Sequence, residues 1–196
     1  MNLPNKLTLL RIFLMPVMVI LFYFKLYILA AVVFVFAAFT DMLDGRIARK
    51  NNIVTVVGKF VDPLADKLIN IAAITILSGQ ICLSGEKWYG IFAIITTVII
   101  VSREIIITSL RALAANEGVV IAADKMGKLK TVLQDIAIVT MFIDQSKYID
   151  KIPFVSELIH WMAVVLLIGA LVLTIISGIN YFTSNKELMN KITKDI

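Results

Sequence analysis

Residues 41–66 read DMLDGRIARKNNIVTVVGKFVDPLAD and combine four aspartates with four basic residues. The flanking runs are apolar, because residues 26–40 and 68–84 contain no charged side chain. Ionisable groups at the edge of lipid are costly, so they usually line a polar cavity or pair with one another. The stretch therefore predicts that two membrane helices bring charged ends together around a polar site.

The chain as a whole is too apolar for a soluble domain of its size. Hydrophobic residues make up 60% of the 196 residues, whereas soluble domains have about 45–50%. Uncharged runs also cover residues 88–102 and 158–184, and segments 7–24 and 131–143 are apolar with polar interruptions. Because a spanning helix needs about 20 residues, we predict an all-α integral membrane protein. It should have about six transmembrane helices in one membrane-embedded domain over residues 1–196.

The expected helices extend from these runs into their charged flanks. The opening segment, with Lys6 and Arg11, suits an interfacial helix that Pro16 bends inward. The third helix has two possible starts, one at Asp62-Pro63 and one near Gly58 with a kink at the proline. The other predicted ranges are 26–49, 88–115, 128–143 and 155–182, and the third helix should end near residue 82.

Basic residues collect on one side of this arrangement. With six spans, that side receives both termini and the segments 41–66 and 103–130, and it holds 15 of the 19 lysines and arginines. Because basic residues favour the cytoplasmic side, we expect a multi-pass protein of the cell (cytoplasmic) membrane with both termini and the polar site in the cytoplasm. Such a face suits anionic lipids and phosphorylated substrates; nucleic acid is not an expected partner.

The aspartates form two helical pairs, Asp41 with Asp44 and Asp62 with Asp66. Each pair lies on one helix face, because its members are three or four residues apart. Four converging carboxylates need counter-charge, and the hard cations Mg²⁺ and Mn²⁺ prefer oxygen ligands. Two such ions can hold the attacking and leaving oxygens of a phosphoryl displacement. Any one of these residues alone would equally suit a structural ion pair.

Small and basic residues accompany the first aspartate pair. Gly45 and Ala48 share the helix face of Asp41 and Asp44, which leaves room beside the helix. Arg49 follows, and a guanidinium can bind a diphosphate through two parallel hydrogen bonds. The chemistry of the stretch therefore indicates metal-dependent displacement on a diphosphate substrate at the membrane surface.

The spacing Asp41-x2-Asp44-Gly45-x2-Ala48-Arg49-x8-Gly58-x3-Asp62-x3-Asp66 resembles the signature of the CDP-alcohol phosphotransferase (phosphatidyltransferase) family. Members use two divalent metals to transfer a phosphatidyl or similar group from a CDP-linked donor to an alcohol, releasing CMP. The resemblance implies that the metal ligands are Asp41, Asp44, Asp62 and Asp66, and that Asp66 is also the catalytic base. It implies that the CDP-lipid donor contacts Asn5, Thr8, Gly45, Ala48, Arg49, Thr55 and Gly58.

Three further segments indicate which branch of the family the chain resembles. They are NLPNKLTLLRIFLMP at 2–16, SREIIITSLR at 102–111 and GKLKTVLQ at 127–134. They are similar to a branch whose donor is CDP-diacylglycerol and whose acceptor is glycerol 3-phosphate. The phosphate of such an acceptor needs a basic pocket, for which the candidates are Lys59, Arg103, Arg111, Lys128 and Lys130. The family resemblance also implies that the protein forms a homodimer and that membrane lipids surround it.

Other interpretations of individual residues remain open. Arg103 and Glu104 could pair with each other, and the lysines at 125, 128 and 130 could bind anionic lipid. Asn5, Thr8 and Arg11 could serve only helix entry and interfacial anchoring. For Gln134 and Asp135 we favour interhelical hydrogen bonds, and for His160 a place at the membrane interface.

Other functions also remain open. The nearest one keeps the chemistry but uses inositol phosphate, serine or another alcohol as the acceptor. A cation transporter would need acidic residues at mid-membrane depth on several helices, whereas these aspartates lie at one side. A non-catalytic scaffold would leave the four aspartates without a role.

Overall fold

A computed structural model describes the backbone of residues 3–51, 56–116, 125–146 and 152–186, with side chains for 8–40, 65, 67–114, 126–146 and 152–186. These residues form helices α1 (Leu3–Tyr23), α2 (Tyr27–Asn51), α3 (Val56–Leu83), α4 (Lys87–Asn116), α5 (Lys125–Asp144) and α6 (Pro153–Ser184). No strand occurs in this part of the chain. The all-α prediction is therefore confirmed for the residues that the structure describes.

Most helix bounds lie within a few residues of their predicted positions, and each helix is longer overall than predicted. α1 continues through Pro16 without a break. α3 begins at Val56, before both predicted starts, so the link from α2 is shorter than the expected loop at residues 50–58. α5 begins at Lys125 instead of residue 128. Extension of this kind pairs further backbone N–H and C=O groups within the helices.

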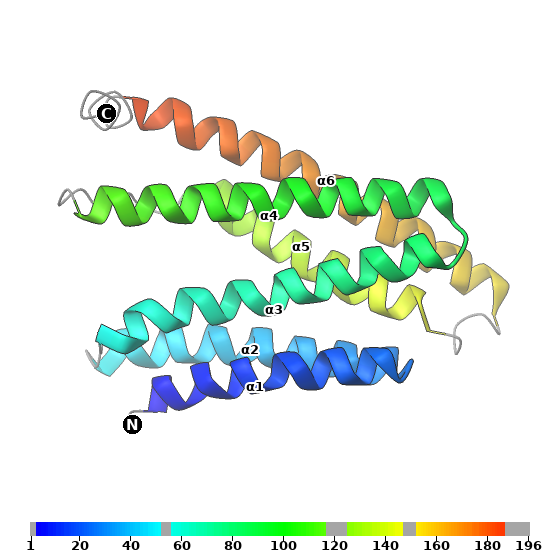
Figure 1. Cartoon of the computed structure of the whole chain (residues 1–196), viewed down its shortest axis with the longest axis horizontal. Helices are drawn as coiled ribbons and strands as arrows, with labels where there is room; N and C mark the ends of the chain where they lie inside the picture. Colours follow the sequence, from blue (N-terminus) through cyan, green and yellow to red (C-terminus); the bar gives the residue numbers. More distant parts are fainter. Residues whose placement is uncertain (1–2, 52–55, 117–124, 147–151, 187–196) are drawn as a thin grey trace.

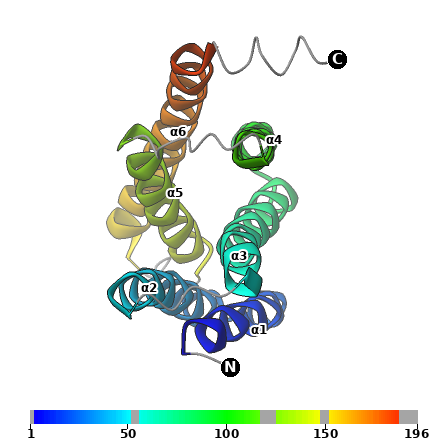
Figure 2. The ribbon, with the colours of Figure 1, turned by 90° about the vertical axis from the view of Figure 1, so that its left-hand side faces the viewer.

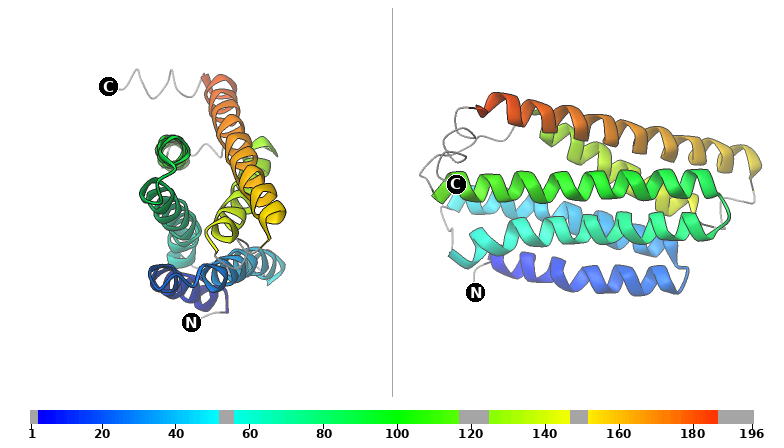
Figure 3. Two further views of the ribbon diagram at one scale, coloured as in Figure 1. Left: turned by 90° about the vertical axis from the view of Figure 1, so that its right-hand side faces the viewer. Right: turned by 45° about the horizontal axis from the view of Figure 1, so that its top comes forward.

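The helices run back and forth along the molecule's long axis (Figure 1). We call the end where α2 ends and α3 begins the aspartate end. We call the opposite end, which carries the turns at residues 24–26 and 84–86, the turn end. Viewed from the aspartate end, the helices form a ring in the order α1, α2, α5, α6, α4 and α3 (Figure 2). Figure 3 shows the same ring from the turn end.

The core lies inside this ring and receives side chains from every helix. Its largest fully buried apolar members include Met18 on α1, Phe34 on α2, Leu77 on α3, Ile100 on α4, Phe142 on α5 and Leu167 on α6. Each of these side chains is at most 2% exposed. The interlocking of apolar side chains from six helices holds both ends of the ring at fixed positions.

Small residues allow α3 and α4 to approach closely. A Cβ atom added to Gly90 would lie 2.4 Å from the Cα atom of Cys82. Farther along the same contact, the hydroxyl of Ser78 lies 2.8 Å from that of Thr97. Small side chains and interhelical hydroxyl bonds are typical of helix contacts within membranes.

Two of the described helices are long and apolar enough to cross a membrane on length and composition alone. They are the segments Lys87–Ala114 of α4 and Pro153–Ser184 of α6. The apolar parts of α1, α2 and α3 are shorter, namely Thr8–Tyr23, Tyr27–Thr40 and Lys67–Leu83. The apolar parts of α2 and α3 are short because the remaining residues of both helices form the charged segments at the aspartate end. Large apolar side chains are exposed on every helix, which is typical of a surface that contacts lipid or another protein.

Candidate functional site

The aspartates occupy two matched levels near the ends of α2 and α3. Asp41 lies ten residues before Asn51, and Asp66 lies ten residues after Val56. At 1.5 Å per residue, both are about 15 Å from their helix ends. Asp44 and Asp62 lie seven and six residues from the same ends, which corresponds to about 10 Å. The helix register therefore puts the two aspartate pairs at similar depths; their side chains lie outside the described ones.

The predicted donor-binding positions belong to the same end of the molecule. Gly45, Ala48 and Arg49 are on the last turns of α2, and Gly58 is in the first turn of α3. Asn5 is in the first turn of α1. Side chains at these positions, like that of Lys59, are outside the described set, and Thr55 lies outside the described residues altogether.

Two polar residues of α1 have described side chains, and both point into the ring. Thr8 is 2% exposed and Arg11 is 1% exposed. They lie three residues apart, on one helix face, and α1 packs against both α2 and α3. A cation buried in this position is more than an interfacial anchor, because an anchoring side chain would reach toward the headgroups.

Near the depth of the aspartates, the carboxylate of one glutamate contacts three cationic side chains. We call Lys67, Arg103, Glu104 and Lys130 the Glu104 cluster. Lys67 Nζ lies 2.6 Å from Glu104 Oε1, and Lys130 Nζ lies 2.7 Å from Oε2. Arg103 Nη1 lies 3.5 Å from the same Oε2 atom. The cluster therefore joins α3, α4 and α5 through charged groups.

The Glu104 cluster carries more positive than negative charge. Among the described side chains, three cations surround a single carboxylate, and the Lys130 side chain is only 3% exposed. Charges that are partly removed from water are weakly screened, so this group of side chains favours an anion. Lys67 directly follows Asp66 on α3, so this anion-attracting group adjoins the acidic segment.

The predicted acceptor pocket is only partly assembled from its predicted residues. Arg103 and Lys130 come together in the cluster, and Arg103 Nη2 also donates to Ser177 Oγ on α6 at 3.1 Å. Arg111 instead lies over the Tyr181 ring, with its guanidinium carbon 5.6 Å from the ring centroid. Lys128 is exposed. Because Lys130 is buried and paired with Glu104, it is not a lipid anchor. The pairing of Arg103 with Glu104, which was one interpretation of the sequence, is present, but its distance is longer than either lysine contact.

Below the cluster, a polar layer separates the charged end from the apolar core. Asn70 Nδ2 donates to Asp135 Oδ1 at 3.0 Å, which confirms the predicted interhelical hydrogen bond of Asp135. A cavity of about 30 Å³ lies between this level and the cluster and is lined in part by Gln134. The buried Gln134 Oε1 atom has no hydrogen-bond partner among the described residues. The cavity has room for one water molecule.

Two members of the cluster were not predicted as site residues, namely Lys67 and Glu104. A signal was present for Lys67, because it follows Asp66 and lies three residues from Asn70, on the face that meets α5. Glu104 was considered only as a partner of Arg103. Its contacts with Lys67 and Lys130 span 37 and 26 residues of sequence, so local spacing could not reveal them.

The amino-acid sequence is similar to a known family and to several named proteins. The family profile described as CDP-alcohol phosphatidyltransferase matches residues 1–176. The CDP-diacylglycerol–glycerol-3-phosphate 3-phosphatidyltransferase of Bacillus subtilis is 36% identical, with 96% of this chain and 97% of that protein covered. The protein of the same name from Rickettsia typhi is 36% identical over 94% of this chain and 97% of its own length. A probable phosphatidylglycerophosphate synthase of Mycobacterium tuberculosis is also 36% identical, covering 92% of this chain and 79% of that protein.

Proposed function

Because the chain belongs to the CDP-alcohol phosphatidyltransferase family, we propose that it transfers the phosphatidyl group of CDP-diacylglycerol to glycerol 3-phosphate. The products are phosphatidylglycerophosphate and CMP, so the chain is a transferase of phospholipid biosynthesis. Relatives whose names state this donor and acceptor cover at least 94% of the chain at 36% identity. Agreement over nearly the whole length supports the same reaction here.

The surplus positive charge of the Glu104 cluster is the observation that carries the choice of acceptor. Glycerol 3-phosphate brings a phosphate, and Lys67 and Arg103 place charged donors beside Glu104, the single carboxylate of the described cluster. Lys130 strengthens the local potential from a buried position. An uncharged acceptor such as glycerol, or the zwitterion serine, would gain less from this arrangement. Inositol phosphate shares the phosphate and is therefore the strongest competitor.

The acidic levels on α2 and α3 suit two divalent cations, Mg²⁺ or Mn²⁺, because carboxylates are the hard oxygen donors that these ions prefer. The proposed ligands are Asp41, Asp44, Asp62 and Asp66. Bound there, the cations would neutralise the diphosphate and stabilise charge on the departing CMP. No group of three potential metal ligands occurs among the described side chains, so the assignment depends on the aspartate motif and its helix register.

The remaining steps belong to side chains of the chain itself. Asp66 takes the proton from the acceptor hydroxyl, which is a poor nucleophile at neutral pH. Arg49 binds the diphosphate, and the small residues beside it admit the nucleotide. The full set of proposed donor contacts is Asn5, Thr8, Gly45, Ala48, Arg49, Thr55 and Gly58. The nucleophilic oxygen forms a new P–O bond to the phosphatidyl phosphorus while the P–O bond to CMP breaks, and CMP leaves.

We also propose that all six helices cross the cytoplasmic membrane, with the aspartate end and both termini in the cytoplasm. Each helix has at least 20 residues, and 20 residues extend about 30 Å, the thickness of the hydrocarbon core. The basic residues concentrated at the aspartate end favour this orientation. The whole chain forms one domain, and the proposed assembly is a homodimer.

A reconstituted assay tests the reaction. The purified protein receives CDP-diacylglycerol and one acceptor at a time, namely glycerol 3-phosphate, inositol phosphate, serine or glycerol, and both CMP and lipid product are measured. We expect product with glycerol 3-phosphate in Mg²⁺ or Mn²⁺, and none after chelation with EDTA. Faster transfer to inositol phosphate than to glycerol 3-phosphate would overturn the proposed acceptor. Undiminished transfer in EDTA would overturn the proposed metal requirement.

A further inference from the structure

A second polar site lies at the turn end, on the opposite side of the core from the aspartates. It is a cavity of about 760 Å³, and its lining comes from the ends of α3 and α5, the starts of α2 and α6, and the turns between helices. We call it the turn-end cavity. The residues that matter for its chemistry are Lys25, Glu86, Asp144, Glu157, His160 and Trp161. Nothing in the proposed transfer reaction uses them.

Within this cavity, His160 connects two carboxylates. Its Nδ1 atom lies 3.3 Å from Asp144 Oδ1, and its Nε2 atom lies 3.6 Å from Glu86 Oε2. The Tyr89 ring packs edge-on against the imidazole at a centroid distance of 5.1 Å. These contacts connect Glu86, Tyr89, Asp144 and His160 along one wall of the cavity.

The charges in the cavity are unequal. Glu86, Asp144 and Glu157 supply three carboxylates, while Lys25 supplies the only permanent cation among the described lining residues. Lys25 lies at the margin of the cavity, in the turn between α1 and α2. The described lining thus offers one ammonium and three carboxylates, of which Asp144 is largely buried and Glu86 and Glu157 are exposed. This set complements a zwitterion and repels a polyanion such as a nucleoside diphosphate.

An apolar groove continues from this margin. It measures about 630 Å³ and is lined by Leu26, Ile28, Leu29 and Val32 of the first turns of α2 and the residue before them. Lys25 and Tyr27 line both the groove and the turn-end cavity. A polar pocket that shares two walls with an apolar groove matches an amphiphile with a compact headgroup and a hydrocarbon chain.

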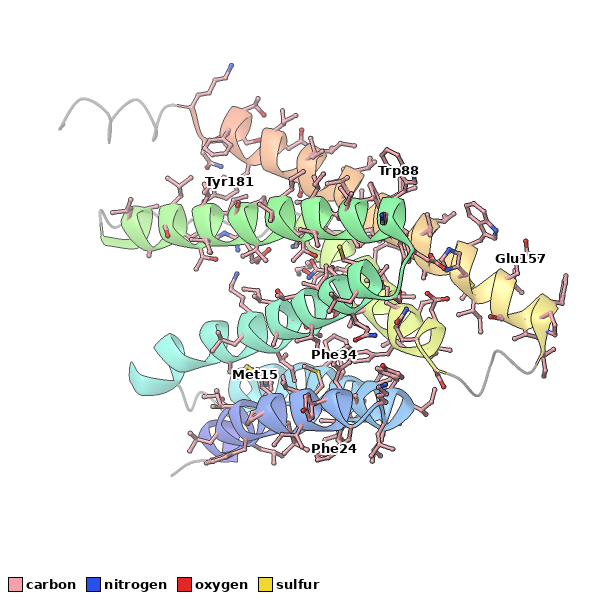
Figure 4. The ribbon with its side chains drawn as sticks, turned by 45° about the vertical axis from the view of Figure 1, so that its right-hand side comes forward. Met15, Phe24, Phe34, Trp88, Glu157 and Tyr181 are labelled. Atoms are coloured by element: carbon pink, nitrogen blue, oxygen red, sulfur yellow. The ribbon has the colours of Figure 1, made fainter. Side chains whose placement is uncertain are left out.

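Aromatic residues place this site at the depth of lipid headgroups. Trp88 is 88% exposed at the start of α4, and Trp161 is 59% exposed on α6. In Figure 4, Trp88 and Glu157 both lie toward the turn end. Tryptophan is enriched at membrane–water interfaces, so the cavity faces headgroups while the groove faces acyl chains.

We propose that the turn end binds one membrane phospholipid with a zwitterionic, ammonium-bearing headgroup. Lys25 contacts the phosphate, the carboxylates of Glu86, Asp144 and Glu157 contact the ammonium, and one acyl chain lies along the groove of α2. This lipid is not the donor of the transfer reaction, because it binds at the opposite end and CDP-diacylglycerol carries no ammonium group. The proposal holds whether or not the transfer assay succeeds.

Position 25 permits a clean test. Lys25 has a φ of 61°, a left-handed conformation that glycine adopts without strain. Lys25→Gly therefore removes the ammonium group without disturbing the turn. Lys87→Gln is the matched control, because Lys87 is exposed at the same end and lines neither the cavity nor the groove.

Delipidated protein in detergent is titrated with palmitoyl-oleoyl phosphatidylethanolamine or with the phosphatidylglycerol of the same chains, and bound lipid is counted by native mass spectrometry. We expect one phosphatidylethanolamine per chain, bound at least five-fold more tightly than phosphatidylglycerol. Lys25→Gly should weaken it at least five-fold and Lys87→Gln by less than two-fold. Equal or tighter binding of phosphatidylglycerol, or full retention in Lys25→Gly, would overturn the proposal.

Discussion

Lys130 on α5 and Glu104 on α4 form an ion pair of 2.7 Å in which the lysine side chain is 3% exposed. Twenty-six residues separate the two in sequence. The pair is the most buried contact of the Glu104 cluster, and it connects α5 to α4 beside the proposed acceptor pocket. The cluster is therefore both a structural joint and the source of the positive potential.

The ion pair of Glu104 with Lys130 should contribute to stability. Glu104→Gln should lower the free energy of unfolding by about 3 kcal/mol, because the buried Lys130 ammonium loses its counter-charge. The double variant Glu104→Gln with Lys130→Met should recover part of the loss, since no uncompensated buried charge remains at position 130. Unfolding of the detergent-solubilised proteins, followed by tryptophan fluorescence, measures both. A double variant less stable than the single one would contradict this account.

Arg103 should act on the acceptor rather than on the donor. Its guanidinium is held by Glu104 and by Ser177, in a position to donate charged hydrogen bonds to a phosphate. Loss of such a bond costs about 2 kcal/mol, so Arg103→Ala should raise the KM for glycerol 3-phosphate by about ten-fold or more. The KM for CDP-diacylglycerol should change by less than about two-fold.

Arg111→Ala is the control for Arg103→Ala, because Arg111 lies over Tyr181 and outside the cluster. It should leave the KM for glycerol 3-phosphate within about two-fold of the original. Similar effects of the two substitutions on both substrates would argue against the acceptor role of Arg103.

Asp66→Asn should abolish proton removal from the acceptor. General-base catalysis contributes about 10²- to 10⁴-fold in rate, so kcat should fall by at least about 100-fold. The variant should still bind CDP-diacylglycerol, as measured by retention of radiolabelled donor, since the proposed donor contacts remain. Turnover at the original rate would remove Asp66 from this role.

Packing of α3 against α4 yields a prediction with an internal control. Gly90→Ala places a Cβ atom 2.4 Å from the Cα atom of Cys82, so the two helices must separate, with a loss of about 1–3 kcal/mol. Gly79→Ala meets nothing within 4 Å on the same pair of helices, and should raise stability by up to about 1 kcal/mol. Thermal unfolding measures both changes, and equal stability of the two variants would contradict this account of the packing.

The proposed orientation can be measured by labelling. In a Cys82→Ser background, Lys87→Cys at the turn end should react with a membrane-impermeant maleimide on intact cells. Lys186→Cys, exposed just beyond α6 at the aspartate end, should react only after permeabilisation. The reverse pattern would place the aspartate end outside the cell, where CDP-diacylglycerol would be inaccessible to it.

The helices and the acidic motif were predictable from the sequence because both are local patterns. Uncharged runs mark the lipid-facing segments, and spacings of three and four residues put carboxylates on one helix face. Helix ends were less predictable, as at α3, whose observed start at Val56 precedes both predicted ones. An Asp-Pro pair is a favourable start, but backbone pairing in an apolar setting continues the helix past it.

The family, the all-α class and the aspartate motif could be predicted from the amino-acid sequence, since each is carried by composition or by short spacings. The contacts between distant groups became visible only in the folded chain. There Lys67, Arg103 and Lys130 meet the carboxylate of Glu104, Arg111 lies over Tyr181, and Glu86 meets His160 at the other end. The physical reason is that such contacts depend on how six helices rotate and pack against one another, and that packing is a property of the whole core rather than of any single segment.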